Sequence, residues 1–212
     1  MKLYSYWRSS AAYRVRIALN YKQIEYQQIT PNLASGEHLT VDYRATNPQG
    51  LVPALAHEGE IITQSLAIIE YLDYVQPKPA LWPADPMARA RVNAMAQVIA
   101  CDIHPLNNLR VLKYLKSEMA QDGAAVSAWY ARWVSEGFSA LETWAGPYSA
   151  DGKHLYGDVV SLADVCLVPQ MYNARRFGVD LQPYPKLIAI DQHLCSLPAF
   201  AAAEPEVQPD AT

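Results

Sequence analysis

Two short groups of residues in the first third of the chain have the composition of an anion-binding site. Arg8, Ser9 and Ser10 lie where a predicted strand turns into a predicted helix. Gln64 and Ser65 stand at the start of a second predicted helix. The first turns of a helix present unpaired backbone N–H groups and a partial positive charge, which stabilise a thiolate or a carboxylate. The chemistry indicated is the binding of a small thiol that carries an amino-acid head group. The Gln64 amide can also bind the amino and carboxylate groups of such a head group.

These serines also have a simpler interpretation. Serine is a preferred N-cap residue, so Ser9 or Ser10 could serve only to cap the first helix, and Ser65 only the second. The first turn contains no cysteine, which excludes a resident redox dithiol. Any thiolate at this turn would therefore have to come from a ligand.

The Val52-Pro53 step stands at the start of a predicted strand. Proline lacks a backbone N–H and is tolerated in sheets at strand starts and edges. A trans bond has the higher base rate there, whereas a cis bond would leave the Val52 backbone free to pair with a peptide-like ligand. The residues themselves leave both alternatives open.

Three arginines are candidates for binding a carboxylate substrate: Arg8, Arg110 and Arg176. A guanidinium can hold a carboxylate through two parallel hydrogen bonds. The ordinary alternative is an exposed arginine without a ligand. Arg175 precedes Arg176 on a predicted helix, and we expect one of this pair to point inward, with Arg176 favoured.

Residues 1–75 alternate strand and helix patterns in the order β-α-β, then β-β-α. This order predicts a small mixed sheet of thioredoxin-like outline, with a parallel pair joined by a helix and a hairpin at the end. We expect Arg14 and Arg16, inside the first helix, to be surface or structural charges. The predicted strands are residues 2–7, 25–29, 51–57 and 60–63, and the predicted helices are 10–22 and 65–75.

Residues 87–203 have almost entirely helical periodicity, which predicts a helical bundle. Ser161 and Asp164 form a capping-box pattern ahead of one of these helices. The proline-rich stretch 77–86 separates the two parts, so we predict a thioredoxin-like domain at 1–76, a linker at 77–86 and an all-helical domain at 87–212. The predicted helices are 87–118, 124–145 and 162–177, with shorter segments after Pro183 and Pro198, and Trp129, Trp133 and Trp144 are expected in the core.

The composition excludes several classes of protein. The chain has 212 residues, 51% of them hydrophobic, and a net charge of −4, which disfavours global disorder, nucleic-acid binding and attachment to an anionic membrane. Cys101, Cys166 and Cys195 form no C-x-x-C pair, and His104 with Asn108 is a weak metal signature interrupted by Pro105, so no metal site is expected. We expect a soluble, cytoplasmic protein.

Three motifs occur in order along the chain: W-R-S-S-x-x-Y-R-V-R-I-A-L at 7–19, N-P-Q-G-L-V-P-A-L at 47–55 and Q-S-L-A-I-I-E-Y-L at 64–72. Together they resemble zeta-class glutathione transferases. The stretches 101–110 and 174–177 match the bacterial maleylacetoacetate and maleylpyruvate isomerases of that class. The resemblance covers essentially the whole chain.

The resemblance implies glutathione as the cofactor. Ser9 or Ser10 would face its thiol, and the Val52 backbone would pair with its cysteinyl portion beside cis-Pro53. The chain departs from the family at Ala11, where relatives often carry cysteine. A mechanism that needs a protein cysteine at that position is thus unavailable.

The resemblance also implies that Gln64 and Ser65 hold the γ-glutamyl carboxylate. A homodimer is expected on the same basis. The other glutathione- or substrate-binding residues that it implies are Gln49 near the glycyl end with His38 as a neighbour, and His104, Asn107 and Asn108 from the helical domain.

The implied activity is the glutathione-dependent cis-trans isomerisation of maleylacetoacetate to fumarylacetoacetate in aromatic amino-acid catabolism. Thiolate addition to the C=C bond, rotation and elimination of the thiolate would perform the reaction, with Ser9, Ser10, Arg8 and Arg176 as catalytic residues. Arg8, Arg110 and Arg176 would bind the small dicarboxylic keto-acid substrate. The alternatives are a maleylpyruvate isomerase of a gentisate pathway, a broader transferase, and a thioredoxin-like adaptor without thiol chemistry.

Overall fold

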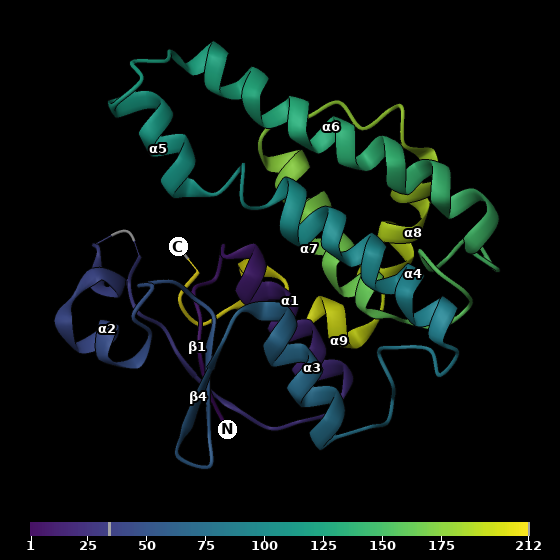
Figure 1. Cartoon of the computed structure of the whole chain (residues 1–212), viewed down its shortest axis with the longest axis horizontal. Helices are drawn as coiled ribbons and strands as arrows, with labels where there is room; N and C mark the ends of the chain where they lie inside the picture. The colour runs from purple at the N-terminus through teal and green to yellow at the C-terminus, as the bar shows by residue number, and fades with distance from the viewer. Residues whose placement is uncertain (34, 212) are drawn as a thin grey trace. The chain divides into compact units, whose positions relative to one another are not determined.

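The computed structural model describes residues 1–33 and 35–211. The chain forms two compact units, shown in Figure 1. The first consists of Met1–Ala80 together with Ser196–Thr212, and the second of Leu81–Cys195. The first unit is therefore built from both ends of the sequence.

The described part of the first unit contains a four-stranded sheet in the order β2-β1-β3-β4. Strand β1 pairs in parallel with β2 and antiparallel with β3, and β3 and β4 form an antiparallel hairpin. Leu3 and Leu55 are opposite each other in this sheet and fully buried, so their pairing fixes the register between β1 and β3. The strands are β1 (Lys2–Tyr4), β2 (Gln27–Ile29), β3 (Ala54–His57) and β4 (Glu60–Thr63).

Helix α1 (Ser10–Tyr21) connects the parallel strands and packs against α3 (Ser65–Val75). This βαβ-ββα arrangement confirms the predicted thioredoxin-like fold. Two elements between α1 and α3 were not predicted. They are the 3₁₀ turn η1 (Glu37–Leu39) and α2 (Val41–Thr46). The first strand ends before the predicted Trp7, because Ser9 N donates to the Tyr6 carbonyl at 2.9 Å and closes a turn there.

The second unit is helical. The single helix predicted at 87–118 was wrong: α4 (Pro86–Gln97) continues into a π-helix, η2 (Val98–Ile103), and a separate α5 (Leu109–Ser117) follows. Pro105 cannot donate a helical hydrogen bond at this break. The other helices of this unit are α6 (Gly123–Tyr148), α7 (Leu162–Arg176) and α8 (Pro185–Cys195).

The predicted capping box at the start of α7 is confirmed. The buried Asp164 carboxylate accepts hydrogen bonds from the Ser161 backbone N and hydroxyl, both at 2.8 Å, and from Leu155 N at 2.7 Å. Asp164 thereby joins the start of α7 to the loop before it.

The expected domain boundaries differ from the structural units. Helix α9 (Pro198–Ala201) and the 3₁₀ turn η3 (Pro205–Val207) belong to the first unit, not to a helical domain at 87–212. Residues 77–80 of the expected linker also belong to the first unit, because the buried Lys22 ammonium binds the Gln76 and Pro79 carbonyls, each at 2.8 Å, and Asp73 at 2.6 Å.

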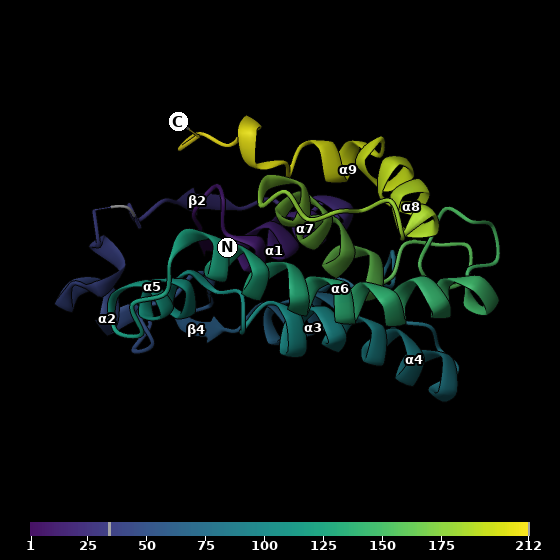
Figure 2. The same ribbon diagram turned by 90° about the horizontal axis from the view of Figure 1, so that it is seen from above.

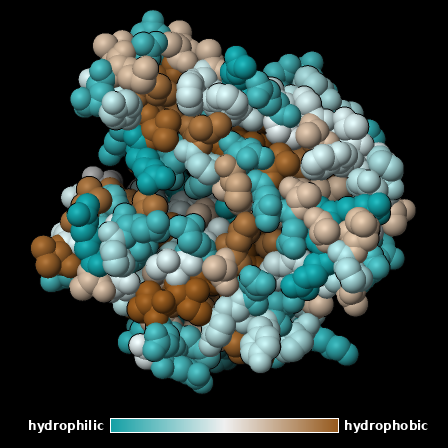
Figure 3. All heavy atoms as spheres, in the orientation of Figure 1, coloured by the Kyte–Doolittle hydropathy of each residue, from teal (hydrophilic) through white to brown (hydrophobic). Residues whose placement is uncertain are grey.

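The exposed surface is mixed in character. On the face shown in Figure 3, hydrophobic side chains form separate patches among hydrophilic ones. Some large apolar side chains are exposed in both units, among them Val41, Tyr74 and Leu109. Over the described residues, no helix combines the length and the apolar character that crossing a membrane requires.

Candidate active site

The turn before α1 gathers the residues expected to face a thiol. Ser9 is the N-cap of α1, since its Oγ accepts from Ala12 N at 3.2 Å, and Ser10 is the first residue of the helix and is buried. The Arg8 guanidinium lies over the Trp7 ring, 4.4 Å from its centroid. The capping interpretation is thus confirmed for Ser9, whose hydroxyl oxygen can accept this bond while its proton is donated elsewhere.

The residues expected to bind a carboxylate, Gln64 and Ser65, lie at the start of α3. Gln64, which precedes this helix, has a φ of 71°, a left-handed backbone conformation that is costly for a residue other than glycine. Such strain is concentrated at functional sites. Ser65 is buried, and its Oγ accepts a hydrogen bond from Arg14 Nη1 at 3.3 Å.

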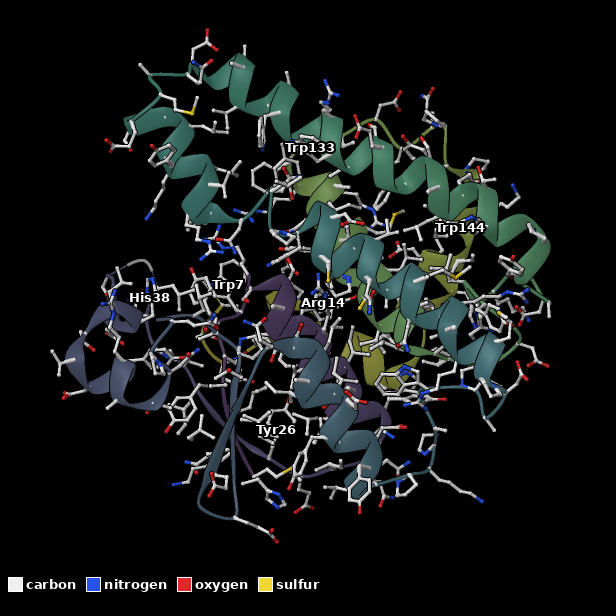
Figure 4. All side chains as sticks on the ribbon, viewed as in Figure 1. Trp7, Arg14, Tyr26, His38, Trp133 and Trp144 are labelled. Atoms are coloured by element: carbon white, nitrogen blue, oxygen red, sulfur yellow. The ribbon has the colours of Figure 1, made fainter. Side chains whose placement is uncertain are left out.

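Arg14 and Arg16 are not surface charges. Arg14 is 1% exposed and Arg16 is 0% exposed, so only the structural alternative of the prediction holds. Arg14 follows Ser10 by one helical turn and donates to Ser65, and it thereby joins the starts of α1 and α3. The Arg14 label in Figure 4 lies beside α1.

The peptide bond between Val52 and Pro53 is cis, as the family resemblance implied. The loop before it is fixed by two side chains that donate to the Leu51 carbonyl, the Asn47 amide and the Tyr43 hydroxyl, each at 2.7 Å. Burial raises the pKa of Tyr43 to about 12, so this hydroxyl keeps its proton at neutral pH. The Val52 backbone is therefore held in place by polar contacts on its N-terminal side.

Gln49 and Gln64 lie together. The Gln64 side-chain amide donates to Gln49 Oε1 at 2.9 Å, and both side chains are exposed. His38 lies in η1, in the segment next to α2 in Figure 4. Its carbonyl would be 2.9 Å from a Cβ at Gly50, which has a φ of +61°, so glycine is required for this close approach. The residues of the first unit that are expected to bind glutathione thus lie on neighbouring loops.

In the second unit, His104, Asn107 and Asn108 lie at the break between η2 and α5. Asn107 is buried, and its side-chain amide donates to the Tyr130 carbonyl at 3.0 Å within its own unit. Asn108 is the N-cap of α5 and accepts from Arg110 N at 3.1 Å. Both asparagines therefore have structural roles that the sequence did not indicate. The Arg110 side chain is exposed.

Arg175 and Arg176 differ in their contacts. Arg175 forms an ion pair with Asp191 on α8, whereas the Arg176 guanidinium lies 5.0 Å from the centroid of the Phe177 ring. Phe177 in turn stacks on Tyr130, with centroids 3.9 Å apart and planes at 18°. Both arginines are exposed, but Arg175 reaches the buried Asp191 carboxylate, so the inward contact is made by Arg175 and not by the favoured Arg176.

The three tryptophans are less buried than expected, and the three cysteines differ in exposure. Trp129, Trp133 and Trp144 are half-buried, and the Trp129 indole N–H donates to the Leu106 carbonyl at 2.9 Å. Cys101 is exposed on η2, although it lies in an apolar stretch. In the described ranges, no group of three or more His, Cys, Asp or Glu side chains is placed to bind a metal.

A thioredoxin-like unit with a cis-proline before β3 and a strained Gln-Ser step before α3, accompanied by a helical unit, is the architecture of a glutathione transferase. Residues 1–74 match the family "Glutathione S-transferase, N-terminal domain". The maleylacetoacetate isomerase of Pseudomonas aeruginosa is 46% identical over 213 residues, covering 99% of this chain and 98% of the relative.

Two solved structures are also similar over their full length. The holo structure of a maleylpyruvate isomerase, described as a bacterial zeta-class glutathione S-transferase, has a TM-score of 0.98 and 47% identity, covering 100% of both chains. A maleylacetoacetate isomerase from Methylobacterium extorquens AM1 with bound malonate and glutathione has a TM-score of 0.95 and 39% identity, also covering 100% of both. The chain belongs to this zeta-class family of maleylacetoacetate and maleylpyruvate isomerases.

Proposed function

We propose that the first unit binds glutathione and that the protein isomerises the cis double bond of maleylacetoacetate to give fumarylacetoacetate. The observation that carries the proposal is the hydrogen bond between Arg14 and Ser65. Ser10 and Arg14 are four residues apart on α1, about 6 Å along the helix axis, and Arg14 in turn bonds to Ser65 at the start of α3. This spacing and the buried cation fit a short anionic peptide.

In this proposal the helix starts bind two of the anionic groups of glutathione, its thiolate and its γ-glutamyl carboxylate. Ser9 or Ser10 donates a hydrogen bond to the thiolate, and the partial charge at the start of α1 lowers the pKa of the thiol. Gln64 and Ser65 bind the γ-glutamyl carboxylate, with the buried Arg14 charge behind them. The remaining proposed contacts are the Val52 backbone next to Pro53 with the cysteinyl portion, and Gln49 and His38 near the glycyl end.

When bound, glutathione supplies a thiolate that adds to the activated C=C bond and later leaves. After the addition and before the elimination, the former double bond is a single bond and can rotate. The chain holds the substrate carboxylates on Arg8, Arg110 and Arg176, and we propose the same arginines for stabilising the negative charge that develops on the keto oxygen. His104 and Asn108 are proposed as further polar contacts to glutathione or substrate. Asn107 keeps only a supporting role in this proposal, because its amide is bonded inside the helical unit.

The experiment is an ultraviolet assay of freshly prepared maleylacetoacetate with the purified protein, with and without glutathione. Conversion that requires glutathione and returns it intact supports the proposal. Consumption of glutathione into a stable adduct would instead indicate a conjugating transferase. If glutathione neither binds nor promotes conversion, the protein is an adaptor without thiol chemistry.

Maleylpyruvate is a second candidate substrate. The similarity to a maleylpyruvate isomerase structure over the whole chain favours it, and both compounds share the cis double bond next to a keto-acid group. Running both substrates in the same assay distinguishes them by the ratio of kcat/KM values.

The serine hydroxyls can be tested individually. In Ser9→Ala and Ser10→Ala, we expect the pKa of the bound thiol, followed by thiolate absorbance, to rise in the variant that removes the donor. Unchanged turnover in both variants and in the double variant would contradict a role for either hydroxyl.

We also propose that the protein is a cytoplasmic homodimer, as implied by the family. Light scattering at the assay concentration tests the dimer, and a monomeric mass would contradict it.

A further inference from the structure

The backbone of Trp7 is held on both sides by charged side chains. Trp7 N donates to Asp210 Oδ2 at 3.0 Å, and the Trp7 carbonyl accepts from Arg16 Nη2 at 3.0 Å. Asp210 is 203 positions away in the sequence, whereas Arg16 lies on α1. Hydrogen bonds with an ionised partner are among the stronger ones, so this residue is firmly placed.

Arg16 connects the same turn to the C-terminal segment (residues 196–211). Its Nη1 donates to Ser5 Oγ at 3.1 Å and to the Tyr6 carbonyl at 3.4 Å. Its Nε and Nη2 both donate to the Ala203 carbonyl, at 3.1 and 3.0 Å. Burial lowers the pKa of Arg16 to about 10, which still leaves the guanidinium charged at neutral pH.

The C-terminal segment is itself ordered by its own contacts. Gln208 Nε2 donates to the carbonyls of Ala202 and Glu204 at 3.1 and 2.7 Å, and Phe200 is fully buried. Figure 2 shows the end of the chain passing near β2, and Gln28 on β2 donates to Asp210 Oδ1 at 3.5 Å. Asp210 is thus presented to Trp7 by a fixed backbone.

The turn that receives these bonds carries the proposed thiol and substrate contacts. Ser9 N closes it on the Tyr6 carbonyl at 2.9 Å, the same oxygen that Arg16 binds. Arg8 lies over the Trp7 ring, which Figure 4 labels near the start of α1. A shift of the Trp7 backbone would therefore move both the Arg8 guanidinium and the Ser9 hydroxyl.

We propose that Asp210 and Arg16 are positioning residues for the reaction, through which the C-terminal segment holds the Trp7-Arg8-Ser9 turn in its substrate-binding conformation. The proposal rests on the proposed function, in which Arg8 and Ser9 contact substrate and glutathione. Neither Asp210 nor Arg16 touches the reacting atoms in this proposal; they act only on the turn.

The test compares three variants of the full chain: Asp210→Ala, Asp210→Asn, which keeps a side-chain acceptor oxygen, and Glu206→Ala as a control. Glu206 carries an exposed carboxylate in the same segment. We expect kcat/KM for the isomerised substrate to fall about tenfold in Asp210→Ala, as for the loss of one charge-assisted hydrogen bond. Asp210→Asn should recover most of this loss, and Glu206→Ala should match the wild type.

Two measurements separate positioning from general destabilisation. Hydrogen exchange at the Trp7 amide should accelerate in Asp210→Ala, while amides of α6 keep their protection. In the Arg8→Ala background, Asp210→Ala should lower kcat/KM by a smaller factor than in the wild type, because the part of the loss that acts through Arg8 is already present and only the part through Ser9 remains. Fully additive losses, or equal losses in Asp210→Ala and Glu206→Ala, would overturn the proposal.

The exchange measurement does not depend on turnover. If the wild type lacks isomerase activity, the proposed function fails, while a faster Trp7 exchange in Asp210→Ala would still establish the structural contact. If the wild type is active and Asp210→Ala is equally active, the positioning proposal fails and the proposed function stands.

Discussion

Arg175 on α7 forms an ion pair with Asp191 on α8, although it directly precedes Arg176, which has been proposed to bind substrate. The Asp191 side chain is 1% exposed, whereas that of Arg175 is 46% exposed. Adjacent arginines on one helix thus have separate tasks. Arg175 neutralises a buried carboxylate, and Arg176 lies on the Phe177 ring with its guanidinium exposed.

Substitution Arg176→Ala is expected to raise KM for the dicarboxylic substrate by roughly 10- to 100-fold, as for the loss of a charge-assisted contact. KM for glutathione should change little. Steady-state kinetics with each substrate varied in turn measures both. Arg132→Ala is a matched control, since Arg132 is an exposed arginine of the same unit that pairs with Glu136 along α6 and, like Arg176, lies over an aromatic ring, that of Trp133. Equal changes in both KM values would contradict a substrate contact.

Substitution Arg175→Ala is expected to act on stability. It leaves the Asp191 carboxylate buried without its counter-charge, which should lower the free energy of unfolding by roughly 2–3 kcal/mol. This loss is smaller than for a pair in which both side chains are buried, because the Arg175 side chain is partly exposed. Urea unfolding monitored by circular dichroism measures the loss. Adding Asp191→Asn should restore part of it by removing the charge. A variant as stable as the wild type would show that the pair contributes nothing.

Substitution Ser9→Ala should lower the free energy of unfolding by about 1 kcal/mol, because it removes the N-cap of α1. Ser9→Thr keeps a cap oxygen and should recover most of that loss. Thermal and urea unfolding of the two variants provide the comparison. If both variants unfold like the wild type, the cap bond to Ala12 is energetically unimportant.

We expect Tyr130 to make the stability of the folded protein sensitive to alkaline pH. Burial raises its pKa from 10.0 to about 12 in the folded chain. A tyrosine whose pKa is higher in the folded state than in the unfolded state contributes to stability below pH 10. This contribution, roughly 2–3 kcal/mol, is lost as the pH rises towards 12. Tyr130→Phe keeps the stack on Phe177 but cannot ionise. Its unfolding free energy should therefore decline less between pH 10 and 12, and parallel curves for the two proteins would contradict this prediction.

Gly137 on α6 lies against the π-helix η2. A methyl group there would come within 2.7 Å of Ile103 Cγ1, and Ile103 is buried. Gly137→Ala should destabilise the protein by about 1–2 kcal/mol, because overpacking outweighs the better helix propensity of alanine. Adding Ile103→Val makes room and should recover part of the loss in a thermal unfolding experiment. A more stable Gly137→Ala variant would show that Ile103 adjusts without cost.

Local patterns were sufficient to predict the sheet topology and most helices. The apolar residues of β1, β3 and α3 follow the periods of their elements, and the serines and the Gln64-Ser65 step mark helix starts. Helix α2 was missed because it has only six residues and buries only Tyr43, so no amphipathic period could develop. The break after η2 was missed because buried apolar residues continue through the π-helix, which left Pro105 as the single sign of it.

The site was predictable where it depends on sequence neighbours and unpredictable where it depends on distant ones. The family resemblance of a short motif implied the cis bond at Pro53, and cap preference narrowed the N-cap of α1 to Ser9 or Ser10, of which the structure has Ser9. In contrast, Arg16 is buried because it satisfies carbonyls of residues 6, 7 and 203, and no local pattern indicates such a set. The stack of Arg176, Phe177 and Tyr130 likewise joins two helices whose pairing the sequence does not specify.

The contribution of residues 196–211 to the first unit has a consequence for synthesis on the ribosome. Translation usually lets domains fold in the order in which they emerge. Here residues 81–195 emerge before the segment that supplies Asp210 and the Ala203 carbonyl, so the second unit can fold while the first still lacks part of its structure. Until then, the buried guanidinium of Arg16 has no Ala203 partner, and the nascent first unit is expected to be the better substrate for chaperones.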